Sequence, residues 1–308
     1  MENAILSKKY ILLIPAALSI LIFAATITSV NSVMAQNNVQ TIRISNNDTK
    51  ASENILLPNG TISLSNVSVP LHKEDVKYYK NTSGYLVYPE INKTQTNSSD
   101  KKLPAVIIIH EWWGLNENIK NMANELAKEG YAVLAVDLYN GKVASNPNEA
   151  MELVNKARDN QNESNSNLLA AVKYLKTLDY INQTKVASLG WCFGGGQSLQ
   201  LALNTDTQDP LAATVLYYGN LVTDEKTLSK IDWPVLGIFG GLDQSIPVSE
   251  VEKFEQALNA NNITNEIYIY EDVGHAFANP TGGGFAPAEL NDAWEKTVNF
   301  LEQYVKNK

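Results

Sequence analysis

The stretch LPAVIIIH, from Leu103 to His110, is the feature that most constrains the fold of this chain. It is a continuous apolar run rich in β-branched residues, which is typical of a strand buried on both faces. Further runs of this kind follow: YAVLAVDLY, KVASLG, LAATVLYYG, WPVLGIFGGLD and NEIYIYEDVGHAF. Helical patterns separate or close them at 117–129, 147–159, 163–179, 249–260 and 287–305. This alternation predicts an α/β protein with a mostly parallel sheet and helices on both faces.

The residues before position 76 have a different composition. Two lysines precede an apolar run over 11–30, and small residues follow it before Gln36, which is the pattern of a signal peptide over 1–35. The run approaches the ~20 residues that span a bilayer, so an uncleaved membrane anchor is the alternative. Both readings predict an exported protein, either secreted or anchored to the outer face of the cytoplasmic membrane. Residues 36–75 are rich in Asn, Ser and Thr and are interpreted as a polar linker or a short appended segment, before a domain over 76–308.

Charge and cysteine content exclude some classes of function. The formal net charge is −9, so the chain lacks the basic surface that nucleic-acid binding requires. Arg43 and Arg158 are the only arginines, which limits how the protein can recognise carboxylates. Cys192 is the only cysteine, so no disulfide can form within the chain.

Cys192 lies in the motif GWCFGGG, between the predicted strand KVASLG and the helical stretch QSLQLALN. A strand, a G-x-C-x-G sequence and a helix are the arrangement of a nucleophile elbow. Gly190 and Gly194 leave room for the sharp turn, and the helix N-terminus favours a thiolate at its apex. The alternative is a buried cysteine that acts as a small apolar residue, but the three glycines and the helix start fit that alternative poorly.

A nucleophile of this kind needs a base and an acid that orients the base. Of the three histidines in the chain, His275 lies just after the last predicted strand, and Asp243 lies just after the strand before it. The order Cys192, Asp243, His275 is the order of nucleophile, acid and base in α/β-hydrolases. Each residue falls where a parallel strand ends, which is where open α/β sheets place their sites. Asp272 is a weaker candidate for the acid, because it is so near His275 in the sequence.

Residues 75–305 resemble the dienelactone hydrolase family of the α/β-hydrolases. The resemblance rests on the motifs HEWWGLN (110–116), DLYNGK (137–142), GWCFGGG (190–196), GGLDQSIP (240–247) and GHAFANP (274–280). It implies that Glu111 contacts the resting nucleophile as a gate or proton acceptor. It also implies an oxyanion hole made by the backbone N–H groups of Phe193 and Trp112, with Trp112 and Trp113 along the pocket. The alternatives are a surface glutamate and tryptophans that only pack the loop.

The chain departs from the family where substrate carboxylates are bound. The resemblance implies two arginines, but Lys142 and Asn279 stand at or near their places. A lysine lacks the bidentate fork of an arginine, so this departure argues against a carboxylated dienelactone as the substrate. The sequence therefore predicts a hydrolase of lactones or small esters that works through a thioester. A general carboxylesterase and a non-catalytic binding protein are the alternatives. Neither a cofactor nor a metal is expected, because no cluster of ligands has suitable spacing.

Overall fold

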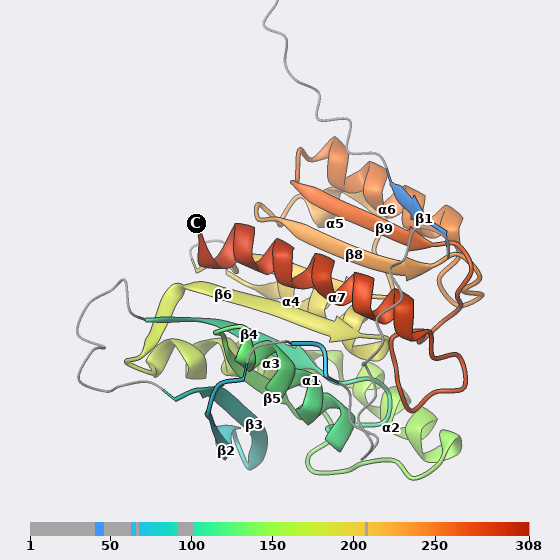
Figure 1. The fold of residues 1–308 in the computed structure, drawn as a ribbon. Helices are drawn as coiled ribbons and strands as arrows, with labels where there is room; N and C mark the ends of the chain where they lie inside the picture. The colour runs from blue at the N-terminus through green and yellow to red at the C-terminus, as the bar shows by residue number, and fades with distance from the viewer. Residues whose placement is uncertain (1–40, 46–62, 66–67, 91–101, 207–208, 308) are drawn as a thin grey trace, which may run out of the picture. The chain divides into compact units, whose positions relative to one another are not determined.

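The computed structural model describes residues 41–45, 63–65, 68–90, 102–206 and 209–307 of the chain. These residues form one nine-stranded sheet in the order β1-β9-β8-β7-β6-β4-β5-β3-β2. Strand β3 pairs antiparallel with both β2 and β5, and all other neighbours are parallel. The prediction of a mostly parallel α/β sheet is confirmed (Figure 1).

The strands are mostly short and buried, as the apolar runs predict. Their bounds are β1 (Ile42–Ile44), β2 (Leu71–Tyr79), β3 (Thr82–Pro89), β4 (Leu103–Ile109), β5 (Ala132–Val136), β6 (Ile181–Trp191), β7 (Ala213–Tyr217), β8 (Val235–Gly240) and β9 (Asn265–Tyr270). Every residue of β5, β7 and β8 is buried. Strands covered on both faces in this way need no polar alternation, which explains their continuous apolar sequences.

The helices lie close to their predicted positions. Their bounds are α1 (Glu117–Lys128), α2 (Pro147–Asp159), α3 (Gln161–Thr177), α4 (Phe193–Asn204), α5 (Glu225–Leu228), α6 (Val248–Ala260) and α7 (Pro287–Leu301), followed by the π-helical turn η3 (Glu302–Lys306). Asparagine side chains cap two of the N-termini: Asn116 accepts from the N–H of Ile119, and Asn146 accepts from that of Glu149. Each cap thus provides an acceptor for a backbone N–H group of the first turn, which has no partner within the helix.

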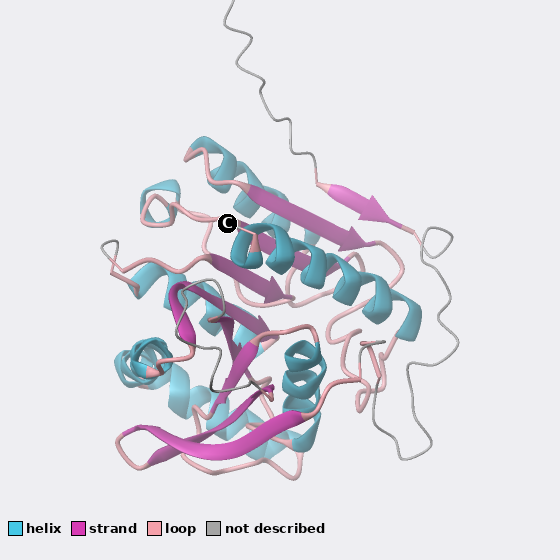
Figure 2. Cartoon of the chain, turned by 60° about the vertical axis from the view of Figure 1, so that its left-hand side comes forward, coloured by secondary structure: helices cyan, strands magenta, loops and turns pink. Residues whose placement is uncertain are grey.

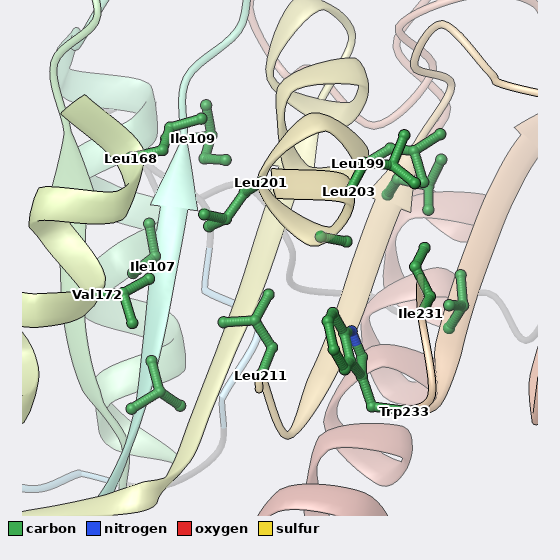
Figure 3. Packing of buried hydrophobic residues seen from close by; sticks show 14 of the residues in the cluster. Ile107, Ile109, Leu168, Val172, Leu199, Leu201, Leu203, Leu211, Ile231 and Trp233 are labelled. Carbon is green, nitrogen blue, oxygen red and sulfur yellow. The ribbon is translucent and has the colours of Figure 1, made fainter. Parts of the chain in front are cut away.

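Helices cover both faces of the sheet, as Figure 2 shows. On one face, α3 and α4 contribute Leu168 and Leu201 to an apolar cluster that continues to Trp233 (Figure 3). Helix α6 adds Phe254 to the same cluster. On the other face, α1 and α7 contribute a second cluster that includes Trp294. Helix α2 belongs to neither face. It packs beside the carboxyl ends of the strands, where it forms one wall of a cavity.

Part of the segment 36–75 belongs to the sheet. Strand β1 pairs in parallel with β9, with Ile42 opposite Tyr268, and β2 begins at Leu71. Glu125 of α1 accepts hydrogen bonds from the backbone N–H groups of Leu64 and Ser65, at 2.8 and 2.9 Å. These residues fall in the segment 36–75, which the sequence analysis interprets as a polar linker or a short appended segment, and they take part in the sheet.

The N-terminal prediction concerns residues 1–35, which lie outside the described part of the chain. Within the part that the structure describes, no helix combines the length and the apolar character that a bilayer crossing needs.

Candidate active site

Cys192 occupies a sharp turn between β6 and α4. Its backbone angles, φ 54° and ψ −118°, lie outside the regions that residues other than glycine usually adopt. The turn is closed by direct backbone contacts, because a Cβ atom on Gly190 would collide with the carbonyl of Gly194. A Cβ on Gly194 would in turn collide with the carbonyls of Ile109 and His110. The glycines of the motif are thus needed to bring the helix start against β4, and this contact holds the thiol at the end of the sheet.

The structure brings together the three residues that the sequence order predicts. His275 Nδ1 lies 2.7 Å from Asp243 Oδ2, and His275 Nε2 lies 3.1 Å from Cys192 Sγ. The other carboxylate oxygen, Asp243 Oδ1, accepts hydrogen bonds from the N–H groups of Ser245 and Ile246. Both carboxylate oxygens are therefore used. The side chain of Asp243 is fully buried and that of His275 is 31% exposed, so the imidazole faces the cavity.

The electrostatics of this chain favour a charged imidazole. Burial alone would lower the pKa of His275, but the hydrogen bonds to Asp243 and Cys192 raise that pKa to about 10. Burial would raise the pKa of Asp243, and the contact with His275 overcomes this and lowers it. The carboxylate thus stabilises positive charge on the ring and orients it. The partner of His275 is Asp243, not the alternative acid Asp272.

Tyr218 is a residue of the site that the sequence analysis does not identify. Its ring packs edge-on against that of His275, with centroids 5.2 Å apart, and it is buried at the wall of the same cavity. Its φ of 36° is unusual for a residue with a side chain and lets the chain turn directly after β7. The signal in the sequence was only the end of an apolar run, LAATVLYYG, which reads as core.

Glu111 lies directly after β4 and is only 3% exposed. Its Oε2 accepts a hydrogen bond from the side-chain amide of Asn279 at 2.5 Å. Burial raises its pKa to about 7, although the charge of His275 and the Asn279 hydrogen bond act in the opposite direction. His110 fixes the backbone here, because its Nδ1 lies 2.6 Å from the Glu111 carbonyl and its Nε2 accepts from the N–H of Leu138.

Glu111, Cys192, Tyr218 and His275 line a cavity of about 470 Å³. Trp112, Trp113 and Phe193 line it, as the resemblance implies, and the two indole rings touch with centroids 4.8 Å apart. Phe193 is the first residue of α4, where backbone N–H groups have no partner within the helix. Arg158 of α2 also lines this cavity and was not identified from the sequence, because a lone arginine on a helix carries no motif.

Lys142 does not reach this cavity. It lines a separate cavity of about 300 Å³, together with Tyr139 and Lys156. The structure thus places Lys142 at a different cavity from the one that Cys192 lines. Asn279 does line the cavity of Cys192, but its side-chain amide is hydrogen bonded to protein atoms.

The donor atoms of the site suit acid–base chemistry. No group of three or more His, Cys, Asp or Glu side chains within the described ranges could hold a metal ion. A thiol, an imidazole and a buried carboxylate in contact form the arrangement that activates a nucleophile.

Comparisons with known proteins show which family this chain resembles. The sequence pattern of the Dienelactone hydrolase family matches residues 91–305. A Salmonella typhimurium protein named "Putative carboxymethylenebutenolidase" is 31% identical over 264 residues, which cover 80% of this chain and 90% of that protein. A structure described as "Putative Dienelactone Hydrolase" from Klebsiella pneumoniae has a TM-score of 0.64 and 26% identity. The match covers 76% of this chain and 100% of that chain.

The fold is shared more widely. The α/β-hydrolase enzyme MGS-M1, from a deep-sea metagenome library of the Medee basin, matches with a TM-score of 0.56 at 16% identity. The match covers 76% of this chain and 98% of that one. A family pattern that spans most of the chain, together with a relative of this identity and coverage, decides the assignment. The protein is a hydrolase with the α/β-hydrolase fold, and it belongs to the dienelactone hydrolase family.

Proposed function

We propose that the protein cleaves a lactone or a small ester through Cys192, His275 and Asp243. The observation that carries this proposal is the continuous contact from carboxylate to imidazole to sulfur, at 2.7 and 3.1 Å, at the wall of a cavity. A thiolate paired with an imidazolium is a strong nucleophile toward an acyl carbon. Fixed by two backbone N–H groups and by burial, Asp243 keeps the ring in the orientation that this pairing needs.

In the first half of the reaction, the sulfur of Cys192 attacks the carbonyl carbon of the ester. The carbonyl oxygen gains negative charge and is stabilised by the N–H groups of Phe193 and Trp112. The bond to the leaving oxygen then breaks, and His275 donates its proton to the departing alkoxide. The product of this half is a thioester between the acyl group and Cys192. A lactone leaves its alcohol attached to the same acyl chain.

In the second half, the now neutral His275 accepts a proton from water. The hydroxide formed attacks the thioester carbon, and the carbon–sulfur bond breaks. The carboxylic acid leaves, and the thiolate of Cys192 is again paired with the imidazolium. No redox step occurs, and the reaction consumes one water for each ester bond.

The lining of the cavity supports a small substrate with an apolar part. Trp112, Trp113, Met151, Val154 and Phe193 provide most of the surface beside the nucleophile. Such a lining binds an acyl or ring portion by burying apolar area, and the few polar groups set its orientation.

The test is hydrolysis of 4-nitrophenyl acetate and of a panel of lactones by the wild type and Cys192→Ala. We expect the variant to lose turnover of both kinds of substrate. Equal rates in the two proteins would overturn the proposal and favour a binding protein. Faster turnover of simple esters than of every lactone would favour the general carboxylesterase.

We further propose that the protein is exported, either secreted or held through residues 11–30 at the outer face of the cytoplasmic membrane. The charged start, the apolar run and the small residues before Gln36 support this. N-terminal sequencing of the protein from fractionated cells tests it. A mature N-terminus near Gln36 indicates a cleaved signal peptide, whereas the full chain in the cytoplasmic fraction would contradict export.

A further inference from the structure

Asn279 has a fixed orientation in the wall of the cavity. Its Oδ1 accepts hydrogen bonds from the backbone N–H and the hydroxyl of Thr281, at 2.8 and 2.7 Å. Two donors at one end of the amide mean that this end must be the oxygen. The amide nitrogen is therefore directed the other way, where it donates to Glu111 Oε2 at 2.5 Å. Thr281 thus determines which end of Asn279 faces the carboxyl group.

Glu111 and Cys192 line the same cavity but have different partners. Glu111 is held by Asn279, and the sulfur of Cys192 is held by His275. The second carboxyl oxygen, Glu111 Oε1, is buried and has no hydrogen-bond partner among the described residues. Among the described residues no hydrogen bond joins Glu111 to Cys192, whereas the resemblance implies a contact between them. The position that the resemblance assigns to an arginine is occupied by a neutral amide, whose length and orientation suit Glu111.

We propose that Asn279, fixed by Thr281, is a positioning residue that holds the Glu111 carboxyl group away from Cys192, so that the thiol is paired with His275 before any substrate binds. This inference rests on the proposed function, because it concerns the same nucleophile. The loop after His275 thus helps to keep Cys192 paired with His275, and this pairing does not depend on bound substrate. Asn279 acts through Glu111 and does not touch the reacting atoms.

The charges around Glu111 explain why its position matters. The charge of His275 acts on Glu111 from the loop after β9, and Tyr218, directly after β7, lines the same cavity. Arg158 of α2 lines the same cavity. A carboxylate released from Asn279 would be buried with one partner fewer, and it would find that partner in the nearby thiol. A carboxylate in contact with the sulfur disfavours the thiolate, because like charges repel.

The experiment measures alkylation of Cys192 by iodoacetamide without substrate, followed by mass spectrometry between pH 5.5 and 8. We expect Asn279→Ala to slow alkylation by about tenfold at pH 8, where the Glu111 carboxyl group is ionised, and to leave the rate at pH 5.5 unchanged, where Glu111 keeps its proton; tenfold corresponds to one unit on the pH axis. The double variant Asn279→Ala with Glu111→Gln should recover the wild-type rate, because no carboxylate is left to compete. Exposed Asn204, whose amide donates to the Gln200 carbonyl on its own helix, provides the control Asn204→Ala.

Thr281→Val supplies a milder variant that keeps the backbone donor and removes the hydroxyl. We expect a smaller slowing of alkylation in the same direction, again cancelled by Glu111→Gln. Slowing that persists in the double variant would show a merely structural role for Asn279 and overturn the inference, as would an Asn279→Ala protein alkylated like the wild type. A protein that is alkylated as expected but hydrolyses no ester would instead overturn the proposed function, so the two failures are distinguishable.

Discussion

The two sides of the cavity are built in different ways. On the reacting side, backbone contacts between glycines hold Cys192, and three hydrogen bonds hold the Asp243 carboxylate that orients His275. On the opposite side, helix α2 contributes Met151, Val154 and Arg158, of which the first and last are exposed. One side is fixed by main-chain geometry, and the other is a surface of side chains on a helix that belongs to neither core.

This difference shows what each side can contribute. A reacting group must keep its position to within a fraction of an ångström, so it is placed on rigid elements with every polar atom paired. Recognition of a substrate tolerates more movement and can rest on exposed side chains. Under the proposed function, we expect the reacting side to determine the kind of reaction and the α2 side to adjust which esters enter. Changes on the first side should have large effects, and changes on the second should have small effects that depend on the substrate.

The largest effect is expected from Asp243→Asn. The N–H groups of Ser245 and Ile246 require an acceptor at Oδ1, so the new amide nitrogen must face His275 Nδ1. This nitrogen donates to Nδ1 and forces the ring proton onto Nε2. A protonated Nε2 can no longer accept the proton of Cys192. We expect kcat to fall by about 10⁴-fold with an unchanged fold.

The measurement is steady-state hydrolysis of an aryl ester, normalised to the folded fraction by circular dichroism. Asp232→Asn, at an exposed position, is the matched control and should keep wild-type turnover. A loss of less than tenfold in Asp243→Asn would show that the carboxylate is not needed to orient the ring.

The second prediction concerns the glycines of the turn. An alanine at Gly194 would place its Cβ against the carbonyls of Ile109 and His110, and backbone cannot move aside cheaply. We expect Gly194→Ala to lower the free energy of unfolding by about 4 kcal/mol in urea denaturation, with loss of activity. Gly283→Ala is the control from another part of the cavity lining, since no atom lies within 4 Å of its added Cβ. Equal stability of the two variants would contradict the close contact of β4 with the elbow.

The same contrast explains what could be predicted from the sequence. The parallel sheet and the elbow follow from local patterns, because a continuous apolar run and a G-x-C-x-G sequence each permit few conformations. The meeting of Cys192, Asp243 and His275 follows from their places after parallel strands, which end at one edge of a sheet. These inferences concern main-chain geometry, which short sequence patterns encode well.

Side-chain direction is encoded less well. Lys142 follows a strand that ends at the same edge, yet it lines another cavity. Arg158 reaches the cavity only because α2 packs across the ends of the strands, which no local pattern shows. Strand β1 is missed for a related reason: Ile42–Ile44 is short and polar around its centre, and only its pairing with β9 makes it a strand.

The third prediction concerns Glu111 and pH. Its pKa is raised from 4.5 to about 7, so the folded state holds its proton more tightly than the unfolded chain does. The stability that the protonated group contributes is present below about pH 4.5 and is lost as pH rises through about 7. Glu111→Gln cannot ionise and avoids this loss. We expect the free energy of unfolding of the variant, relative to that of the wild type, to rise by up to about 3 kcal/mol between pH 4.5 and pH 8.

Urea unfolding of both proteins at the two pH values measures this gain. A stability difference that is the same at pH 4.5 and pH 8 would show that burial does not shift the titration of Glu111. The comparison uses each protein against itself, so any constant cost of the substitution cancels.

The smallest effect is expected on the α2 side, where Arg158 is exposed. An exposed guanidinium attracts a substrate carboxylate only weakly through water, so Arg158→Gln should lower kcat/KM by about fivefold for an ester with a carboxylate on its acyl chain. The uncharged ester of the same length should be turned over unchanged. Arg158→Lys should lie between the two, because it keeps the charge and loses the bidentate fork. Lys156→Gln, on the same helix but at the neighbouring cavity, is the matched control. If Lys156→Gln lowered kcat/KM as much as Arg158→Gln, the overall positive charge of α2 would steer the substrate. Selection on the α2 side would then not depend on a specific contact with Arg158.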